Sequence, residues 1–157
     1  MENRNSFGLM PQIYNGKEHL TFSVGRLYGP GPYHKHAAII MNSAFEVVKR
    51  ITARFRRTLD IHEFAILDGK AALYTFYDVE KMPSDTSALN VTGYHQTKIA
   101  NGGFQERDIK TGRVLFEWRA LPHVSIGESH NAEALLNTRN QFWDFLCVSI
   151  SPYPAEC

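Results

Sequence analysis

The segment 104–118 restricts the fold more than any other part of the chain, because two alternating polar and apolar runs flank a Lys-Thr-Gly turn. Successive side chains of a strand point to opposite faces, so this two-residue period indicates a strand on each side of the turn. Gly112 provides the positive φ angle that a tight turn needs. The segment therefore predicts a β-hairpin.

Other β-prone runs are separated by turn signals, of which Asn15-Gly16 is the strongest local indication of a tight hairpin. The expected strands are 11–14, 19–26, 37–41, 45–52, 61–67, 71–77, 103–109 and 113–119. We predict an all-β protein with two consecutive four-stranded antiparallel meanders, 8–53 and 60–120, that resemble the blades of an incomplete β-propeller. An eight-stranded barrel or sandwich would give the same number of strands.

The second meander is interrupted by a segment with little periodicity and many Pro, Ser, Asp, Asn and Gly residues. We predict a loop insertion over 79–102. The two blade-like units together take up 8–130. Asn131 can cap a short helix, but Pro152 and Pro154 disfavour regular structure, so the tail 131–157 is predicted to be irregular or partly helical.

The charge balance of the chain argues against a polyanionic partner. The formal net charge is +1 and charged residues make up 21% of the chain, so no nucleic-acid partner is expected. No segment approaches the roughly 20 apolar residues of a membrane helix, so no membrane span is expected. The sequence as written has no apolar signal region and predicts a cytoplasmic protein, whereas a missing N-terminal leader would make it secretory.

Three groups of residues are weaker candidates for chemistry. The basic run of Arg54, Arg56 and Arg57 is either a phosphate or sulfate contact or a solvated loop. His34 and His36 are either metal ligands on one strand face or part of a solvent-facing loop. The third group consists of three carboxylates, Glu106, Asp108 and Glu117. They are either an acid/base pair or part of a surface network with Arg107 or Arg113.

The two cysteines, Cys147 and Cys157, lack the spacing and the histidine companions of a zinc site. They can be free thiols or a disulfide, and the compartment cannot be read from them.

The amino-acid sequence of the 104–118 hairpin, together with Leu121, His123 and Val124 after it, resembles the repeat of fungal arylsulfotransferase-like proteins. Upstream, Leu-Thr-Phe at 20–22, Ala-Ile-Ile-Met-Asn at 38–42, Phe-Glu-Val-Val at 45–48 and Asp-Ile-His-Glu-Phe at 60–64 follow in the order shown by that family. The resemblance implies the N-terminal portion of a β-propeller.

The resemblance also implies an activity and a site. Propeller-type arylsulfotransferases move a sulfuryl group between phenolic compounds through a transiently sulfated histidine, without a nucleotide donor. It therefore implies a small aromatic or phenolic substrate, no cofactor, a place in fungal secondary metabolism, and His62 as the candidate catalytic residue, because the family has a channel-facing histidine in this His-Glu-Phe context. A neutral imidazole nitrogen is a good nucleophile near pH 7, which suits this chemistry.

The sequence departs from the family after Trp143-Asp144-Phe145, where the family continues with His-x-Asn-Ser and this chain has Leu-Cys-Val-Ser. This leaves a second hypothesis, a truncated non-catalytic fragment or accessory binding protein in which His62 is a half-buried structural histidine. Such a protein is expected to self-associate through open blade edges. A third hypothesis is a compact barrel or sandwich that binds a small hydrophobic ligand.

Overall fold

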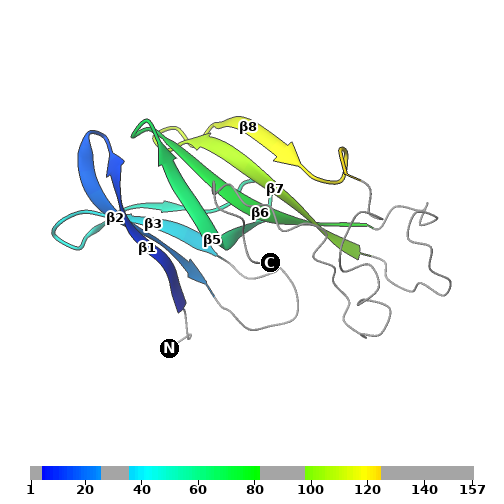
Figure 1. The fold of residues 1–157 in the computed structure, drawn as a ribbon, viewed down its shortest axis with the longest axis horizontal. Helices are drawn as coiled ribbons and strands as arrows, with labels where there is room; N and C mark the ends of the chain where they lie inside the picture. The colour runs from blue at the N-terminus through cyan, green and yellow to red at the C-terminus, as the bar shows by residue number, and fades with distance from the viewer. Residues whose placement is uncertain (1–4, 26–35, 82–97, 125–157) are drawn as a thin grey trace.

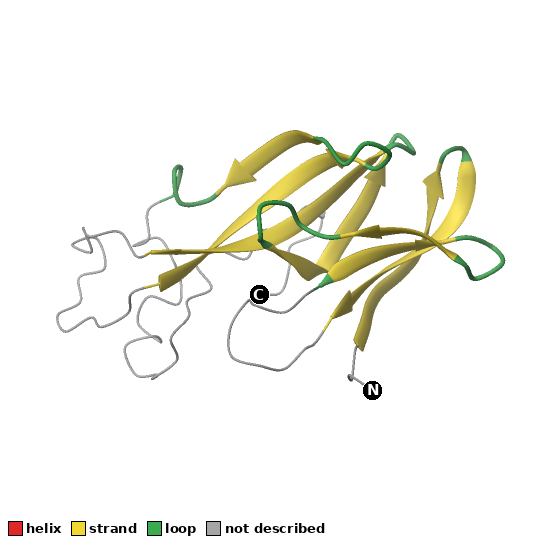
Figure 2. Cartoon of the chain, turned by 180° about the vertical axis from the view of Figure 1, so that it is seen from behind, coloured by secondary structure: helices red, strands yellow, loops and turns green. Residues whose placement is uncertain are grey.

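The computed structural model describes residues 5–25, 36–81 and 98–124, and these residues form β-strands joined by turns (Figure 2). Sheet A contains β1 (Asn5–Tyr14), β2 (Lys17–Gly25), β3 (Ala37–Met41) and β4 (Val47–Ile51). Sheet B contains β5 (Thr58–Leu67), β6 (Ala71–Lys81), β7 (Lys98–Asp108) and β8 (Val114–Arg119). Figure 1 shows sheet A in blue to cyan and sheet B in green to yellow.

The strands of each four-stranded sheet follow one another in chain order, and every neighbouring pair is antiparallel. The predicted all-β class with two consecutive meanders that resemble propeller blades is therefore confirmed. The alternative of an eight-stranded barrel is wrong for the described residues, because they form two separate sheets, and the alternative of a sandwich stays a prediction. In the same ranges, no helix is long and apolar enough to cross a membrane.

Two short hairpin turns, the predicted one at Asn15-Gly16 and one at Asp68-Gly69, have positive φ angles at both central residues. Asn15 and Gly16 have φ angles of 49° and 72°, and Asp68 and Gly69 have φ angles of 49° and 65°. A turn of this kind needs positive φ at both central residues, which Asn, Asp and Gly tolerate best. The two turns also contact each other, since the backbone N–H of Asn15 donates to the carbonyl oxygen of Gly69 at 3.0 Å.

The first strand is longer than the sequence predicts, since β1 begins at Asn5. Its pairing with β2 shifts register between Phe7 and Met10, and Gly8 within this irregularity has a φ angle of 62°. Pro11 follows this bulge and pairs with Leu20, and its missing N–H is tolerated because β1 lies at the edge of sheet A.

The predicted loop insertion over 79–102 is wrong at both of its ends. Strand β6 continues to Lys81 and β7 begins at Lys98, in a ladder that pairs Asp78 with Asn101 and Lys81 with Lys98. The polar composition of this ladder disfavours a strand on propensity, but ion pairs and hydrogen bonds to neighbouring strands offset that preference. The middle of the insertion, 82–97, and the predicted tail, 131–157, lie outside the described residues.

An apolar cluster among the described residues joins the two sheets. Its buried members are Tyr14, Ala38, Ile40 and Ile51 from sheet A with Leu59, Ala72, Tyr74 and Ile109 from sheet B and its turns. Ile40, Leu59 and Tyr74 are fully buried. Burying apolar area of this kind contributes roughly 25 cal/mol per Å² to folding, so the cluster stabilises the contact between the two sheets.

The first strands of the two sheets also lie side by side. Strand β5 contacts β1, β2 and β3. The side chain of Gln12 binds the backbone of β5 in the manner of a paired strand: its amide nitrogen donates to the Phe64 carbonyl at 3.0 Å, and its amide oxygen accepts from the Ile66 N–H at 2.6 Å. These bonds satisfy edge groups of β5 and fix its position against β1.

The other face of sheet B carries stacked rings. The Phe104 ring lies 5.7 Å from both Phe116 and Trp118, and Trp118 lies 5.5 Å from His123. Phe116 remains 50% exposed. The self-association predicted from open blade edges stays a prediction.

Candidate functional site

His62 lies on a large irregularity in β5. The pairing of β5 with β6 joins Leu59 to Phe76 and then Phe64 to Tyr74, so the segment 60–63 stands opposite Thr75 alone. Extra residues in one strand bend it and change where its side chains point. Here Asp60 and Ile61 are buried, at 7% and 6% exposure, whereas the His62 side chain is 73% exposed.

The exposed imidazole is held from one side by a buried carboxylate. His62 Nδ1 lies 2.8 Å from Asp60 Oδ1, which also accepts the backbone N–H of Ile61 at 2.7 Å. The second carboxylate oxygen, Oδ2, accepts the Thr75 hydroxyl at 3.1 Å. Both oxygens of Asp60 therefore have donors, and the rest of the His62 ring is open to solvent.

Sequence reasoning singled out His62 but assigned no role to Asp60 or Thr75. The Asp-x-His spacing keeps the two residues within reach of each other along the strand, but the shared face expected of a regular strand is not observed, because Asp60 is buried and His62 is exposed. Thr75 could not be found from the sequence, because its place opposite the irregularity depends on the register between β5 and β6.

Two further elements approach β5 near His62. The bulge of β1 passes beside it, and a Cβ on Gly8 would lie 3.8 Å from the His62 carbonyl oxygen. His36 Nδ1 lies 2.9 Å from the Leu59 carbonyl oxygen, and its ring occupies the space that a side chain on Gly25 would need. His36 therefore contacts the β5 backbone, and His34 lies outside the described residues.

No observation on the described residues supports the hypothesis of a metal site. Over residues 5–25, 36–81 and 98–124, no group of three or more His, Cys, Asp or Glu side chains is arranged to hold a metal ion. Cys147 and Cys157 lie outside these ranges.

The basic run does not form one surface patch. Arg54 and Arg56 are exposed, as a solvated loop predicts, but only 7% of the Arg57 side chain is exposed. Arg57 Nε lies 3.0 Å from Asp78 Oδ2, and its Nη1 donates to Glu117. Its guanidinium also lies over the Phe76 ring, 4.6 Å from the ring centre. Arg57 is committed to two carboxylates and is not available as the predicted sulfate contact.

A buried glutamine connects this arginine to the core. Gln105 is fully buried, accepts the Tyr74 hydroxyl at 2.7 Å and donates to Glu117 at 2.7 Å. We refer to Arg57, Tyr74, Asp78, Gln105 and Glu117 as the Arg57 cluster.

The register excludes an acid/base pair between Glu117 and Glu106. Gln105 pairs with Glu117 and Glu106 pairs with Phe116, so the two carboxylates lie on opposite faces of sheet B. Arg107 is not the partner of Glu117, because it donates to the Gly112 and Thr52 carbonyls and Glu117 binds Arg57, whereas the other predicted partner, Arg113, acts on Asp108 through its charge.

Three members of the Arg57 cluster have pKa values that depart from the ordinary ones: Glu117, Arg57 and Tyr74. Burial alone would raise the pKa of the Glu117 carboxyl, but the hydrogen bonds from Arg57 and Gln105 and the charge of Arg57 outweigh it and lower that pKa. Burial lowers the pKa of Arg57, and the two carboxylates more than reverse this, so its pKa is raised. Burial raises the pKa of the Tyr74 hydroxyl, against the opposing charge of nearby arginines.

We expect the free energy of unfolding to decrease as the pH is lowered below about 4.5, the ordinary pKa of a glutamate side chain. Folded protein binds a proton at Glu117 more weakly than the unfolded chain does, so this stabilisation is complete above that value and is lost as pH falls through the lowered pKa. Urea denaturation between about pH 7 and pH 3 measures the dependence. Glu117→Gln should flatten it, whereas Glu106→Gln, on the opposite face, should not.

Part of the dependence should remain in the Glu117→Gln variant. Hydrogen bonds from the Thr111 hydroxyl and backbone N–H lower the pKa of Asp108, which titrates in both proteins. Identical pH curves for Glu117→Gln and the parent protein would contradict the assigned role of Glu117.

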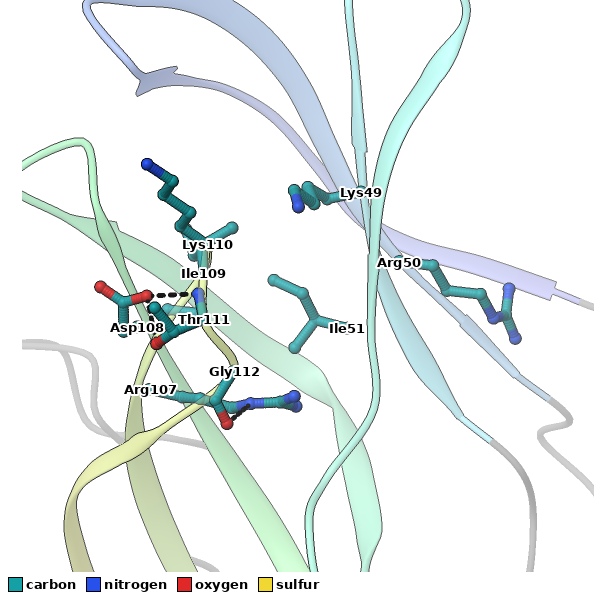
Figure 3. A pocket seen from close by; sticks show the side chains of 10 residues that line it. Lys49, Arg50, Ile51, Arg107, Asp108, Ile109, Lys110, Thr111 and Gly112 are labelled. Carbon is teal, nitrogen blue, oxygen red and sulfur yellow. Dashed lines mark hydrogen bonds between the residues drawn. The ribbon is translucent and has the colours of Figure 1, made fainter.

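A separate pocket of about 200 Å³ lies between β4 and the turn that joins β7 to β8 (Figure 3). Lys49 extends from β4 toward the turn and Lys110, whereas Arg50 points to the other side of the strand. Polar groups at the turn already have partners, since Arg107 Nε donates to the Gly112 carbonyl at 2.8 Å. The lining contains none of the residues around His62, so this pocket is distinct from the His62 site.

Comparison with known proteins identifies the family. The family model described as Arylsulfotransferase (ASST) matches residues 28–146, a range that includes β3 to β8 and the irregularity at His62. No curated protein and no solved structure gives a match. Because the family model covers well over half of the 157 residues, the chain belongs to the arylsulfotransferase family.

Proposed function

We propose that this protein transfers a sulfuryl group from an aryl sulfate ester to a phenol, and that a ring nitrogen of His62 carries the group between them. The observation that supports this is an imidazole held at Nδ1 by the buried Asp60 and otherwise open to solvent, within a chain of the arylsulfotransferase family. Such an arrangement presents a nucleophile without burying it away from a substrate.

The proposed reaction has two steps. In the first, an imidazole nitrogen attacks the sulfur of the donor ester, the N–S bond forms, and the S–O bond breaks with its electron pair leaving on the donor phenolate. In the second, the acceptor phenol attacks the sulfur, the N–S bond breaks, and the phenol proton passes to solvent. The donor phenolate takes up a proton, so atoms and charge balance without a nucleotide or redox partner.

The substrate class follows from the family and the chemistry of the leaving group. A phenolate is a far better leaving group than an alkoxide, so an aryl ester suits a neutral imidazole nucleophile. The resemblance of the 104–118 hairpin and of the His-Glu-Phe segment to fungal members supports a place in fungal secondary metabolism. Arg57 is held by two carboxylates and does not supply the positive charge for the sulfuryl oxygens.

The test is a transfer assay with the purified full chain, 4-nitrophenyl sulfate as donor and phenol as acceptor. We expect release of 4-nitrophenol that depends on the acceptor, with formation of phenyl sulfate, and no requirement for a nucleotide sulfate donor. Mass spectrometry of protein incubated with donor alone should show a species heavier by one SO₃ group.

Absence of both phenyl sulfate and the SO₃ adduct would contradict the proposed activity. That outcome would favour the second hypothesis, a non-catalytic binding protein, which equilibrium binding of 4-nitrophenyl sulfate or phenol would then test. Transfer that required a nucleotide donor would contradict the proposed mechanism instead.

A further inference from the structure

We propose that Asp60 is a positioning residue that fixes the His62 ring in the tautomer with hydrogen on Nδ1, so that Nε2 presents its lone pair to the substrate. The assignment of the tautomer rests on geometry alone, and its catalytic consequence rests on the proposed function. Asp60 need not contact the substrate to have this effect.

The hydrogen-bond inventory of the two side chains determines the tautomer. An ionised carboxylate only accepts hydrogen bonds, so the nitrogen 2.8 Å from Asp60 Oδ1 must carry the hydrogen. In a neutral imidazole the other nitrogen then has the lone pair. Free histidine in water favours the opposite tautomer, so the contact with Asp60 reverses the intrinsic preference.

Asp60 can impose an orientation because it is itself held in place. Its carboxylate is bound by the Ile61 N–H at 2.7 Å and by the Thr75 hydroxyl at 3.1 Å, one donor for each oxygen. Thr75 is 3% exposed, and the Asp60 side chain is 9% exposed. A contact between two exposed side chains would be mobile and weak. Here one partner is anchored in the sheet, and the exposed ring takes its orientation from that partner.

The irregularity of β5 allows Asp60 to be buried while His62 is exposed. In a regular strand Asp60 and His62 would share a face and have the same burial. With the segment 60–63 opposite Thr75 alone, Asp60 turns inward to the Thr75 hydroxyl while His62 reaches solvent. The backbone thus separates a buried orienting group from an exposed reactive group.

The arrangement has two chemical consequences for the proposed transfer. Attack on sulfur by Nε2 places a positive charge on the ring, and the Asp60 carboxylate stabilises that charge through the Nδ1–H contact. The fixed ring also needs no tautomer change before attack. This division of roles between an orienting carboxylate and a reactive imidazole nitrogen is found in hydrolytic triads.

The decisive measurement is the tautomer of His62 in the full-length protein. We would record imidazole ¹⁵N chemical shifts by NMR at an alkaline pH where the ring is neutral, and assign His62 by comparison with His62→Asn. We expect the protonated nitrogen to be Nδ1 in the parent protein. A ring that is predominantly protonated at Nε2 would overturn the proposal, whether or not the protein is active.

Two variants test the role of Asp60 in this preference. Asp60→Ala should shift the neutral ring toward Nε2–H and lower kcat for sulfuryl transfer at least about tenfold, with a smaller change in KM. Thr75→Val, which is close to isosteric, loosens Asp60 without removing it and should shift the tautomer ratio in the same direction by less. An unchanged Nδ1–H tautomer in both variants would overturn the proposal, and Thr75→Val provides the test if Asp60→Ala does not fold.

The two proposals fail in different ways. An Nδ1–H tautomer in a protein without transferase activity would refute the proposed function and leave the positioning by Asp60 in place. An active protein with an Nε2–H ring would do the reverse.

Discussion

Replacing His62 with asparagine is expected to lower acceptor-dependent sulfuryl transfer by on the order of 100-fold or more, because an amide cannot act as the nucleophile. Asparagine keeps an N–H donor near the position of Nδ1, so the contact with Asp60 can persist while the reactive nitrogen is lost. The SO₃ adduct seen by mass spectrometry should disappear together with turnover.

The same variant should fold like the parent protein. The His62 side chain is 73% exposed, and Asp60 Oδ1 still accepts the Ile61 N–H when His62 is removed. No buried acceptor is left unsatisfied, so the free energy of unfolding should change by less than about 1 kcal/mol. Urea denaturation measures this quantity separately from activity.

His19→Asn is the matched control for a general effect of removing a histidine. His19 lies on β2, packs edge-on against Tyr14 at 5.5 Å, and places Nδ1 3.0 Å from the Lys17 carbonyl oxygen. Transfer by this variant should equal that of the parent protein. Full activity in His62→Asn, or equal losses in the two variants, would contradict the role proposed for His62.

The regular parts of the fold were predictable because local chemistry determines them. The Asn15-Gly16 and Asp68-Gly69 turns supply positive φ angles at adjacent residues, which few other pairs provide. Strand β3 has the predicted limits because its apolar run stops at an Asn-Ser turn. In these places the sequence contains the whole physical reason for the structure.

The environment of His62 was only partly predictable. The sequence shows that Asp60 and His62 are two residues apart, which in a regular strand would place both side chains on one face. The burial of Asp60 depends on the Thr75 hydroxyl, fifteen residues away on β6. It also depends on a shift in the register between β5 and β6 that no local sequence pattern predicts. Long-range pairing sets the geometry of the site.

The Arg57 cluster was missed for a related reason. Three arginines within four positions resemble a solvated surface, and two of them are solvated. Arg57 differs because the sheet brings Asp78 and Glu117 to the same place from β6 and β8. The ends of the predicted insertion were misjudged through the same contacts, since charged residues that suggest a loop are paired across the sheet.

Replacing Arg57 with methionine is expected to lower the free energy of unfolding by about 2 to 4 kcal/mol. Methionine keeps apolar contact with Phe76 but leaves Glu117, whose side chain is only 24% exposed, without its cation, whereas Asp78 keeps Arg119 at 3.5 Å. Partial access of water keeps the cost below that of a fully buried unpaired charge. Since domains of this size are stable by about 5 to 15 kcal/mol, the change is a large fraction of the total.

The control is Arg56→Met, which removes the same charge from an exposed neighbour and should change the free energy of unfolding by less than about 0.5 kcal/mol. Adding Glu117→Gln to Arg57→Met should recover part of the loss, because it removes the carboxylate that has lost its cation and keeps the bond to Gln105. Equal effects of the two methionine variants would show that the contacts of Arg57 contribute little. Additive effects of Arg57→Met and Glu117→Gln would contradict the coupling between Arg57 and Glu117, on which the expected pH dependence also rests.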